Sequence, residues 1–187
     1  MDSERNPKAG SPTTTAEEEP TSLTGPAPLE RAPVPAATTS REAACVDALR
    51  QVLSDTWVCY LRAHGGHWNV TGPGFPSLHA LFMAQYTELW NALDEIAERI
   101  RTLGAVTPSS ARAFAAYATL EDRDVPARAP DMIRNLVEGH EGVLASLRRA
   151  LRAAEASGDP GTQDLLTQRL RAHEKSLWIL RSTLAPG

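Results

Sequence analysis

Two histidines and two carboxylates in the middle of the chain are the residue types of a metal site. His67 and His79 flank a Gly-Pro-Gly turn at 72–74, so the turn can bring both imidazoles towards one metal ion. Asp94 and Glu98 are four residues apart, which places both carboxylates on one face of a helix. A mixed set of imidazole and carboxylate donors suits Fe(II).

The spacing of these residues limits how they can meet. His79 and Asp94 are 15 residues apart, which is about 22 Å along one helix. A single helix cannot bring both to one ion, but two copies packed antiparallel about a two-fold axis can, and two equivalent sites result. The alternative is that Asp94 and Glu98 are ordinary surface acids, with Glu98 paired to Arg99 or Arg101.

The other three histidines lie on apolar helical faces. We expect His140 and His173 to pack in the core and to find one hydrogen bond each. The same interpretation applies to His64, which could instead rotate towards the metal site and add a donor there. Cys59 lies among apolar residues in the middle of a helix, where a thiol is expected to be buried and inert.

Apolar residues spaced by three and four predict four long helices and no strand. Their joints are short except for the second, so the fold class is an all-α four-helix bundle with a long crossover that carries a short helix. Gly104 and Gly158 are expected to end helices, and Asp131 to be an N-cap. The expected spans are 42–68, 76–104, 130–158 and from 159–162 onward, with the short helix at 111–117.

Composition divides the 187-residue chain near residue 40. Residues 1–40 hold seven of the fourteen prolines, no aromatic residue, and three basic residues against six acidic ones. We predict a disordered, acidic tail rich in Pro, Thr and Ala, followed by one bundle domain over 41–187.

Several classes of protein are not expected. No run of about eighteen apolar residues is present for a membrane helix, and the N-terminus lacks the apolar region of a secretory signal. Cys45 and Cys59 would lie about 21 Å apart on one helix, too far to form a disulfide. Free thiols fit a reducing compartment, so a cytoplasmic location is expected.

The segment His67–His79, HWNVTGPGFPSLH, resembles the signature of the Dps family of mini-ferritins. The similarity continues through QYTEL at 85–89 and DEIAERI at 94–100, and His173-Glu174-Lys175 with Trp178 resembles the last helix of the family. The resemblance covers about residues 41–185.

This resemblance implies a ferritin-like bundle assembled into a hollow dodecamer. It implies a ferroxidase that oxidises Fe(II) with hydrogen peroxide, and also with O2, at two-fold interfaces. The Fe(III) is stored inside, which protects the cell against oxidative damage. By position, His67 and His79 match the ligands from one subunit, and Asp94 and Glu98 match those from its neighbour. Trp68 matches an aromatic residue beside the site.

One position departs from the family pattern. Many members have an acidic residue four positions after the second histidine, where this chain has Met83. A thioether is a poor ligand for Fe(III) and carries no charge. We expect one iron to be held well, the second less well, and iron loading to be slower.

Acidic residues near the start of the last helix are implied to line a three-fold pore through which iron enters. Asp159 and Asp164 occupy that region, with Glu155 close by in sequence. The alternative is that Asp159 is only an N-cap and Asp164 an acid in the first helical turn.

The alternative function is a nucleoid-associated protein that protects DNA by binding it, with weak or vestigial ferroxidase activity. Relatives that bind DNA generally use termini rich in Lys and Arg. The tail of this chain has only Arg5, Lys8 and Arg31 against its six acids. Because neutralising phosphates needs several clustered cations, strong DNA binding is not expected.

Overall fold

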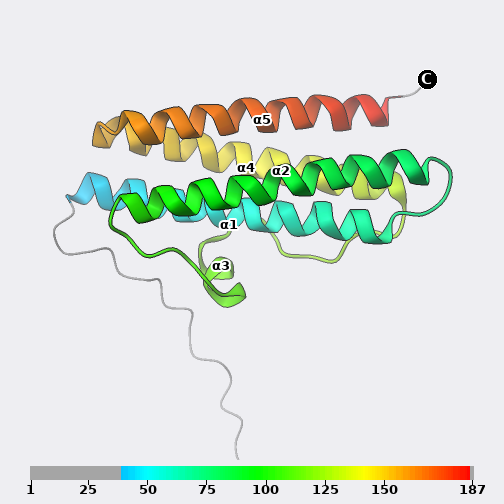
Figure 1. Ribbon diagram of the computed structural model, residues 1–187, viewed down its shortest axis with the longest axis horizontal. Coiled ribbons are helices and arrows are strands. Elements are labelled where there is room, and N and C mark those ends of the chain that lie inside the picture. The colour runs from blue at the N-terminus through cyan, green and yellow to red at the C-terminus, as the bar shows by residue number, and fades with distance from the viewer. Residues whose placement is uncertain (1–38, 186–187) are drawn as a thin grey trace, which may run out of the picture.

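Four long helices lie side by side and one short helix covers them in the computed structural model, which describes residues 39–185 (Figure 1). The predicted tail therefore falls, except for its last two residues, outside the described part. The bounds of the helices are α1 Ser40–Asn69, α2 Phe75–Thr102, α3 Ala111–Tyr117, α4 Ala129–Ser157 and α5 Pro160–Leu184.

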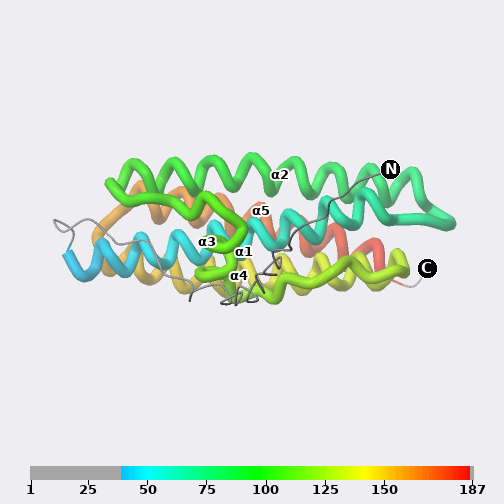
Figure 2. Tube along the Cα trace, turned by 90° about the horizontal axis from the view of Figure 1, so that it is seen from below, coloured from blue at the N-terminus to red at the C-terminus, as the bar shows by residue number. Residues whose placement is uncertain are grey.

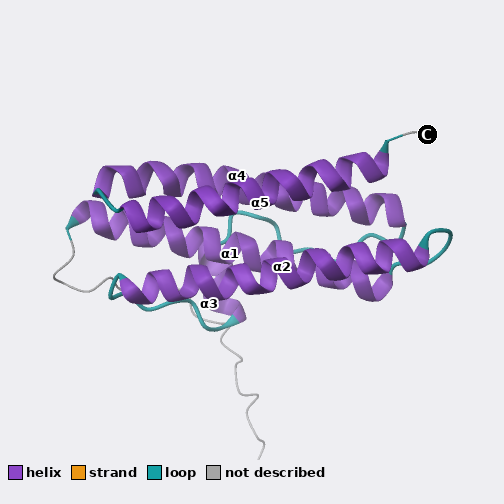
Figure 3. Ribbon diagram, turned by 45° about the horizontal axis from the view of Figure 1, so that its top comes forward, coloured by secondary structure: helices purple, strands orange, loops and turns teal. Residues whose placement is uncertain are grey.

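The helices form two antiparallel pairs. α1 packs against both α2 and α4, while α5 packs mainly against α4 (Figure 1). The connection after α2 returns to the opposite end of the bundle and carries α3 across α1 (Figure 2). Residues 39–185 contain helices and loops but no strand (Figure 3). The predicted all-α bundle with a helical crossover is confirmed.

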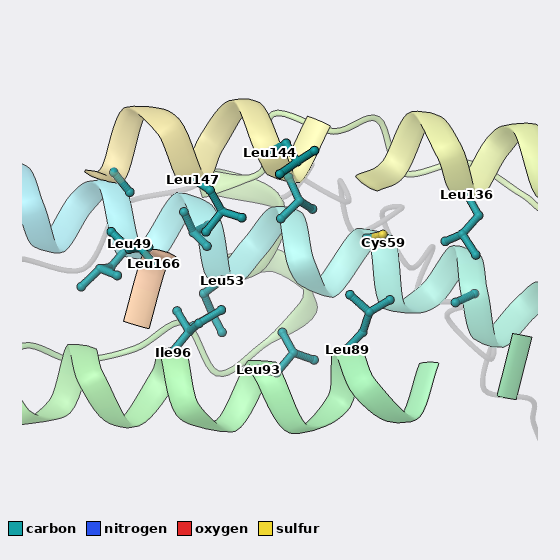
Figure 4. Packing of buried hydrophobic residues seen from close by; sticks show 14 of the residues in the cluster. Leu49, Leu53, Cys59, Leu89, Leu93, Ile96, Leu136, Leu144, Leu147 and Leu166 are labelled. Carbon is teal, nitrogen blue, oxygen red and sulfur yellow. The ribbon is translucent and has the colours of Figure 1, made fainter. Parts of the chain in front are cut away.

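Leucine and isoleucine side chains fill the space between the helices (Figure 4). Each helix contributes residues that recur every three or four positions, so one apolar stripe faces inward. Burying one such side chain stabilises the fold by roughly 1.5–3 kcal/mol. Fully buried examples are Leu49, Leu53, Leu89, Ile96, Leu136, Leu147 and Leu166.

A capping box at Thr39 begins α1. Thr39 Oγ1 accepts a hydrogen bond from Glu42 N at 3.2 Å, and Thr39 N donates to the Glu42 carboxylate at 2.7 Å. This capping box satisfies two backbone donors at the helix end. Helix α1 thus begins at Ser40, two residues before the expected start at 42.

The prediction that Asp131 caps α4 was wrong. The N-cap is Arg128, and Pro130 lies in the first turn, where a missing N–H costs nothing. Asp131 is also in that turn, and its carboxylate accepts a hydrogen bond from Arg134 at 2.6 Å. The predicted helix ends at Gly104 and Gly158 are confirmed, because both glycines adopt positive φ just after a helix.

A buried carboxylate on α1 holds the crossover in place. Asp55 accepts hydrogen bonds from Thr119 N at 2.6 Å and Leu120 N at 2.9 Å, and also from the hydroxyls of Thr119 and Ser146. Its side chain is fully buried, so these donors replace the water it loses. Asp55 thereby fixes where α3 lies on α1.

A second contact orients α3 itself. Phe114 stacks on Trp57 of α1, with ring centroids 5.0 Å apart. About two turns earlier on α1, the buried Arg50 donates from Nε and Nη2 to the carbonyl of Val106. The crossover is therefore anchored before α3 as well as after it.

Replacing Asp55 with alanine should destabilise the fold by about 3 kcal/mol, because two backbone amides and two hydroxyls lose their acceptor. Denaturant unfolding of the metal-free protein measures the effect. The control is Asp131→Ala, which breaks an exposed ion pair worth at most about 1 kcal/mol. Equal losses in the two variants would show that Asp55 does not anchor the crossover.

Candidate functional site

The turn between α1 and α2 brings the two predicted ligand histidines together. His67 lies in the last turn of α1 and His79 near the start of α2. Gly74 caps α2 with a φ of 84°, a conformation that residues with a Cβ rarely adopt. Gly66 allows α2 to approach closely, because an added Cβ would lie 3.1 Å from the Phe82 ring.

The imidazole of each histidine is hydrogen-bonded to the backbone of the other. His67 Nδ1 lies 2.9 Å from the carbonyl oxygen of His79, and His79 Nδ1 lies 2.9 Å from the carbonyl oxygen of His67. The rings stack with centroids 3.7 Å apart and planes at 21°. The two side chains therefore restrain each other, and we call the pair His67 and His79 the histidine clamp.

This clamp determines which nitrogens can bind a metal. A carbonyl oxygen only accepts hydrogen bonds, so both Nδ1 atoms carry the proton. In the neutral imidazole Nε2 then holds the lone pair, and a backbone carbonyl on the other nitrogen is the usual support of a metal-binding histidine. The tautomer of each ring is therefore fixed, and both rings present the lone pair of Nε2 to a metal ion.

His64 lies beside this pair but is held by other contacts. Its Nδ1 is 2.8 Å from the Tyr60 hydroxyl, and its ring packs between Trp68 and Tyr86 at centroid distances of 3.9 and 4.1 Å. The ring centroid lies 6.2 Å from that of His67. Burial, and then the proximity of His67, lowers the pKa of His64.

The two carboxylates lie further along α2, on its exposed side. Asp94 and Glu98 are both exposed, and neither makes an ion pair or a hydrogen bond to another residue between 39 and 185. Arg99 is instead bonded to Asp159, and Arg101 donates to a backbone carbonyl. The pairing of Glu98 with either arginine is therefore not present in the structure.

One copy of the chain does not assemble the four residues. The 15 positions from His79 to Asp94 lie within the single uninterrupted helix α2, which separates them by about 22 Å. Within the described residues, no three His, Cys, Asp or Glu side chains are grouped closely enough to hold a metal ion. The histidine clamp therefore has no acidic partner among residues 39–185.

The comparisons with known proteins place the chain in a family. The profile of the ferritin-like domain matches residues 46–186. A low-temperature-induced protein of Nostoc sp. is 39% identical over 140 residues, which cover 73% of this chain and 78% of the relative. The DNA protection during starvation protein 2 of Bacillus anthracis is 30% identical, over 74% of this chain and 95% of the relative.

Solved structures agree with these relatives. The Dps protein of Vibrio cholerae O1 is 33% identical, with a TM-score of 0.75 over 79% of this chain and 92% of that one. Dps from Thermosynechococcus elongatus is 30% identical, with a TM-score of 0.77 over 81% of this chain and 97% of that one. The chain belongs to the Dps family of ferritin-like proteins.

Met83 lies one helical turn after His79 on α2 of this Dps-family chain and is exposed, as are three aromatic residues around the site. The aromatic residues are Trp68 at the end of α1, and Phe75 and Trp90 on α2. A groove of about 640 Å³ continues this face from Trp90 past Asp94 towards Phe114 of α3. Exposed apolar patches of this kind mark interaction surfaces.

The predicted pore residues differ in how they are bonded. Asp159 is the N-cap of α5, where it accepts hydrogen bonds from Thr162 N at 3.0 Å and Arg99 Nη2 at 2.6 Å. Burial raises the pKa of Asp159, but the hydrogen bonds and charge of these partners outweigh it and lower the pKa to about 2. Asp164 and Glu155 are exposed, and Asp164 accepts a hydrogen bond from Gln168.

The remaining histidines form a pair in the core of this Dps bundle. His140 on α4 and His173 on α5 are buried, with their Nδ1 atoms 2.8 Å apart. One Nδ1 must donate and the other accept, so the accepting ring is neutral. Burial lowers the pKa of both rings, so the donating ring is neutral as well and has the opposite tautomer. Cys59 is also buried, and burial raises the pKa of its thiol to about 12. These residues behave as the sequence predicted.

Two features of the site were missed from the sequence. Tyr60 contacts His64 beside the site and Tyr86 contacts the ligand His67. The spacing of four between Tyr60 and His64 was the available signal. The hydrogen bonds from His67 and His79 to backbone carbonyls could not be predicted from the sequence, because every residue has a carbonyl.

The buried histidine pair predicts a loss of stability in mild acid. Burial, and then the charge of Arg169, lowers the pKa of His140 from 6.5 to about 3, and burial lowers the pKa of His173 well below its usual value. Unfolded chains take up these protons below about pH 6.5 while the folded pair stays neutral. Stability is therefore complete above that pH and decreases as the pH falls towards the folded values.

Thermal unfolding of the metal-free protein between pH 7.5 and 5 measures this slope. A double variant, His140→Gln with His173→Gln, keeps polar side chains that do not titrate, and its unfolding midpoint should depend less on pH. The same slope in both proteins would contradict the assignment.

Proposed function

We propose that the chain is a ferroxidase and iron-storage protein that works as a hollow dodecamer. His67 and His79 of one subunit and Asp94 and Glu98 of a second complete each site at a two-fold interface. Fe(II) is the substrate, and hydrogen peroxide, or O2, is the oxidant. The Fe(III) produced is kept inside the shell, which limits oxidative damage.

The observation that carries this proposal is that the nitrogen ligands and the carboxylate ligands lie far apart along the chain. The histidine clamp presents two nitrogen lone pairs with fixed tautomers, and no acid of the described part of the chain completes a metal site with it. Asp94 and Glu98 are exposed and unpaired within residues 39–185. An antiparallel two-fold dimer of α2 pairs each clamp with the carboxylates of the other copy.

The apolar face around the site supports a second copy of the chain as its partner. Trp68 at the end of α1 is 67% exposed, Trp90 on α2 is 57% exposed, and Phe75 and Met83 on α2 are exposed as well. Interfaces between subunits are enriched in aromatic residues and methionine. Burying these side chains would place two α2 helices in contact, as the shared site requires.

The imidazole and carboxylate ligands have different roles in the chemistry. Neutral imidazoles bind Fe(II) without adding charge, and carboxylates favour the Fe(III) that forms. The Vibrio cholerae relative is described as a member of the ferritin-like diiron-carboxylate superfamily. Two Fe(II) ions supply both electrons that peroxide needs, so no free hydroxyl radical is released. Protection then comes from removing iron and peroxide rather than from coating DNA.

Entry of iron is assigned to the start of α5. Asp164 and Glu155 are exposed, whereas Asp159 is already bonded to Arg99. We propose that Asp164, with Asp159 at the same end of the bundle, contributes to an acidic ring that attracts Fe(II).

The cell compartment is a proposal too. Cys45 and Cys59 are both free thiols, which suits the cytoplasm. No helix within residues 39–185 is long and apolar enough to cross a membrane.

Complementation between variants tests the shared site. One variant carries His67→Ala and His79→Ala, and the other carries Asp94→Ala and Glu98→Ala, so each alone has no complete site. When equal amounts are unfolded and reassembled together, each mixed dimer regains one intact site of two. About one quarter of all sites should then oxidise Fe(II).

Stopped-flow absorbance of Fe(III) measures the recovery, and light scattering verifies that each preparation assembles. Separately assembled variants mixed afterwards are the control and should stay inactive. No recovery in correctly assembled mixed shells would show that the four residues do not form an inter-subunit site.

Replacing Met83 with glutamate should speed Fe(II) oxidation, because a carboxylate one turn from His79 adds an anionic oxygen donor for a second iron. Met83→Leu is the matched control, since it removes the thioether without adding charge. Initial rates at two Fe(II) per site measure the change. Equal rates in Met83→Glu and the wild type would show that this position does not limit iron loading.

A further inference from the structure

Helix α5 is attached to the bundle mainly on one side. It packs along α4, whereas its contacts with α2 are few. Two polar links reach α2: Arg169 bonds the Glu88 carboxylate at 2.5 and 2.9 Å, and the N-cap Asp159 bonds Arg99. Because α1 packs on both α2 and α4, these three helices keep their shared interfaces when α5 moves away. The bundle can therefore open at α5 without unfolding as a whole.

The interface between α4 and α5 contains the buried histidines 140 and 173. The Nδ1 atoms of His140 and His173 share one hydrogen bond of 2.8 Å, and both side chains are shielded from solvent. Within residues 39–185, neither Nε2 atom has a hydrogen-bond partner. The ring whose Nδ1 donates has a lone pair on Nε2, so this nitrogen can take up a proton. The resulting imidazolium would have an Nε2–H donor without an acceptor in the core.

The charged side chain of α5 that acts on the pair is a cation. Arg169 lies one helical turn before His173. Burial lowers the pKa of both histidines most, and the positive charge of Arg169 lowers it further. Glu88 of α2 does not offset this charge at the pair, because both of its oxygens already accept hydrogen bonds from Arg169. A further positive charge on either ring would therefore meet repulsion.

The groups that α1 and α4 bring to this region do not change that balance. Cys59 and Arg62 of α1 lie against α4 at Gly139. The Cys59 thiol stays neutral, because burial raises its pKa to about 12, and Arg62 carries another positive charge. Glu141 of α4 is exposed and bonded to Arg181. None of these groups can act as the counter-ion of a buried imidazolium.

We propose that the His140–His173 pair is an acid-sensitive switch that releases α5 from the bundle. At neutral pH the shared Nδ1 hydrogen bond joins α4 to α5. In mild acid the rings take up protons in the open arrangement, where water surrounds them, and not in the closed one. Protonation therefore favours the separation of α5 from α4.

The size of the effect follows from the titration of exposed histidine. With an ordinary pKa of about 6.5, each exposed ring favours the open form by about 30-fold at pH 5, and two rings favour it by about a thousandfold. The closed pair stays neutral at this pH, since the pKa of His140 is about 3 and that of His173 is lowered well below its usual value. The closed form is therefore fully favoured above pH 6.5 and loses ground as the pH falls.

The consequence for iron rests on the proposed function. Helix α5 has Asp159 as its N-cap and carries Asp164 in its first turns, and both acids are assigned to the entry of iron. Separation of α5 would rearrange that end of each subunit. Stored iron should therefore leave the shell faster in mild acid than at neutral pH.

Hydrogen exchange followed by mass spectrometry tests the switch on the metal-free, full-length assembled protein. Protection factors, which correct for the intrinsic effect of pH on exchange, are measured for each helix between pH 7.5 and 5. Those of α5 should be lower than those of α1 and should fall by about a thousandfold over this range. His173→Gln leaves one titrating ring, so its α5 should show a fall of about 30-fold. The double variant with His140→Gln should show almost none.

Glu141→Gln is the matched control. It removes an exposed ion pair between the same two helices and leaves both histidines in place, so the full fall should persist. Thermal melts verify that all variants are folded. Equal protection of α5 and α1 at every pH would mean that the chain opens only as a whole, and this overturns the switch. The same fall in the double variant as in the wild type overturns it too.

Release of iron separates the switch from the proposed function. Wild-type shells loaded with Fe(III) should lose it to a ferric chelator several-fold faster at pH 5 than shells of the double variant do. Equal rates would overturn the link between the switch and iron release. A wild type that stores no iron would contradict the proposed function, while hydrogen exchange would still decide whether α5 opens.

Discussion

The reciprocal hydrogen bonds between His67 and His79 are the interaction on which the site depends. Each ring gives its Nδ1 proton to the backbone of the other residue, so neither ring can turn without breaking its hydrogen bond. The bonds exist only because Gly74 reverses the chain and Gly66 lets α2 approach α1. Packing and turn geometry thus determine that Nε2, and not Nδ1, is available in each ring to bind a metal ion.

Helix α2 has a second role, because its length separates Asp94 and Glu98 from the histidine pair of the same chain. Because it is straight and uninterrupted from Phe75 to Thr102, its own carboxylates cannot reach its own histidines. The crossover contributes to the same face, since Asp55 anchors it and Phe114 stacks on Trp57. Function in this account requires association, because one folded chain holds only half of each proposed site.

Local sequence rules predicted most of the fold, for reasons that particular residues make clear. The apolar period predicted four long helices, and the Ala- and aromatic-rich composition of 111–117 predicted α3 at its observed bounds. Gly104 and Gly158 end helices because few other residues accept positive φ. Asp131 failed as an N-cap because Arg128 and Pro130 begin the helix earlier. The site residues could be named from type and spacing, but the carbonyl bonds that orient them and the Tyr60–His64 contact depend on how two helices pack.

The central claim, a site shared by two chains, is tested most directly by a crystal structure of the assembled protein soaked with Zn(II), which binds similar donors without redox chemistry. Anomalous scattering locates the ion independently of the protein atoms. The account predicts an ion bonded to Nε2 of His67 or His79 in one chain and to Glu98 in another. An ion held by residues of one chain only, or no ion at the histidine pair of a correctly assembled shell, would contradict it.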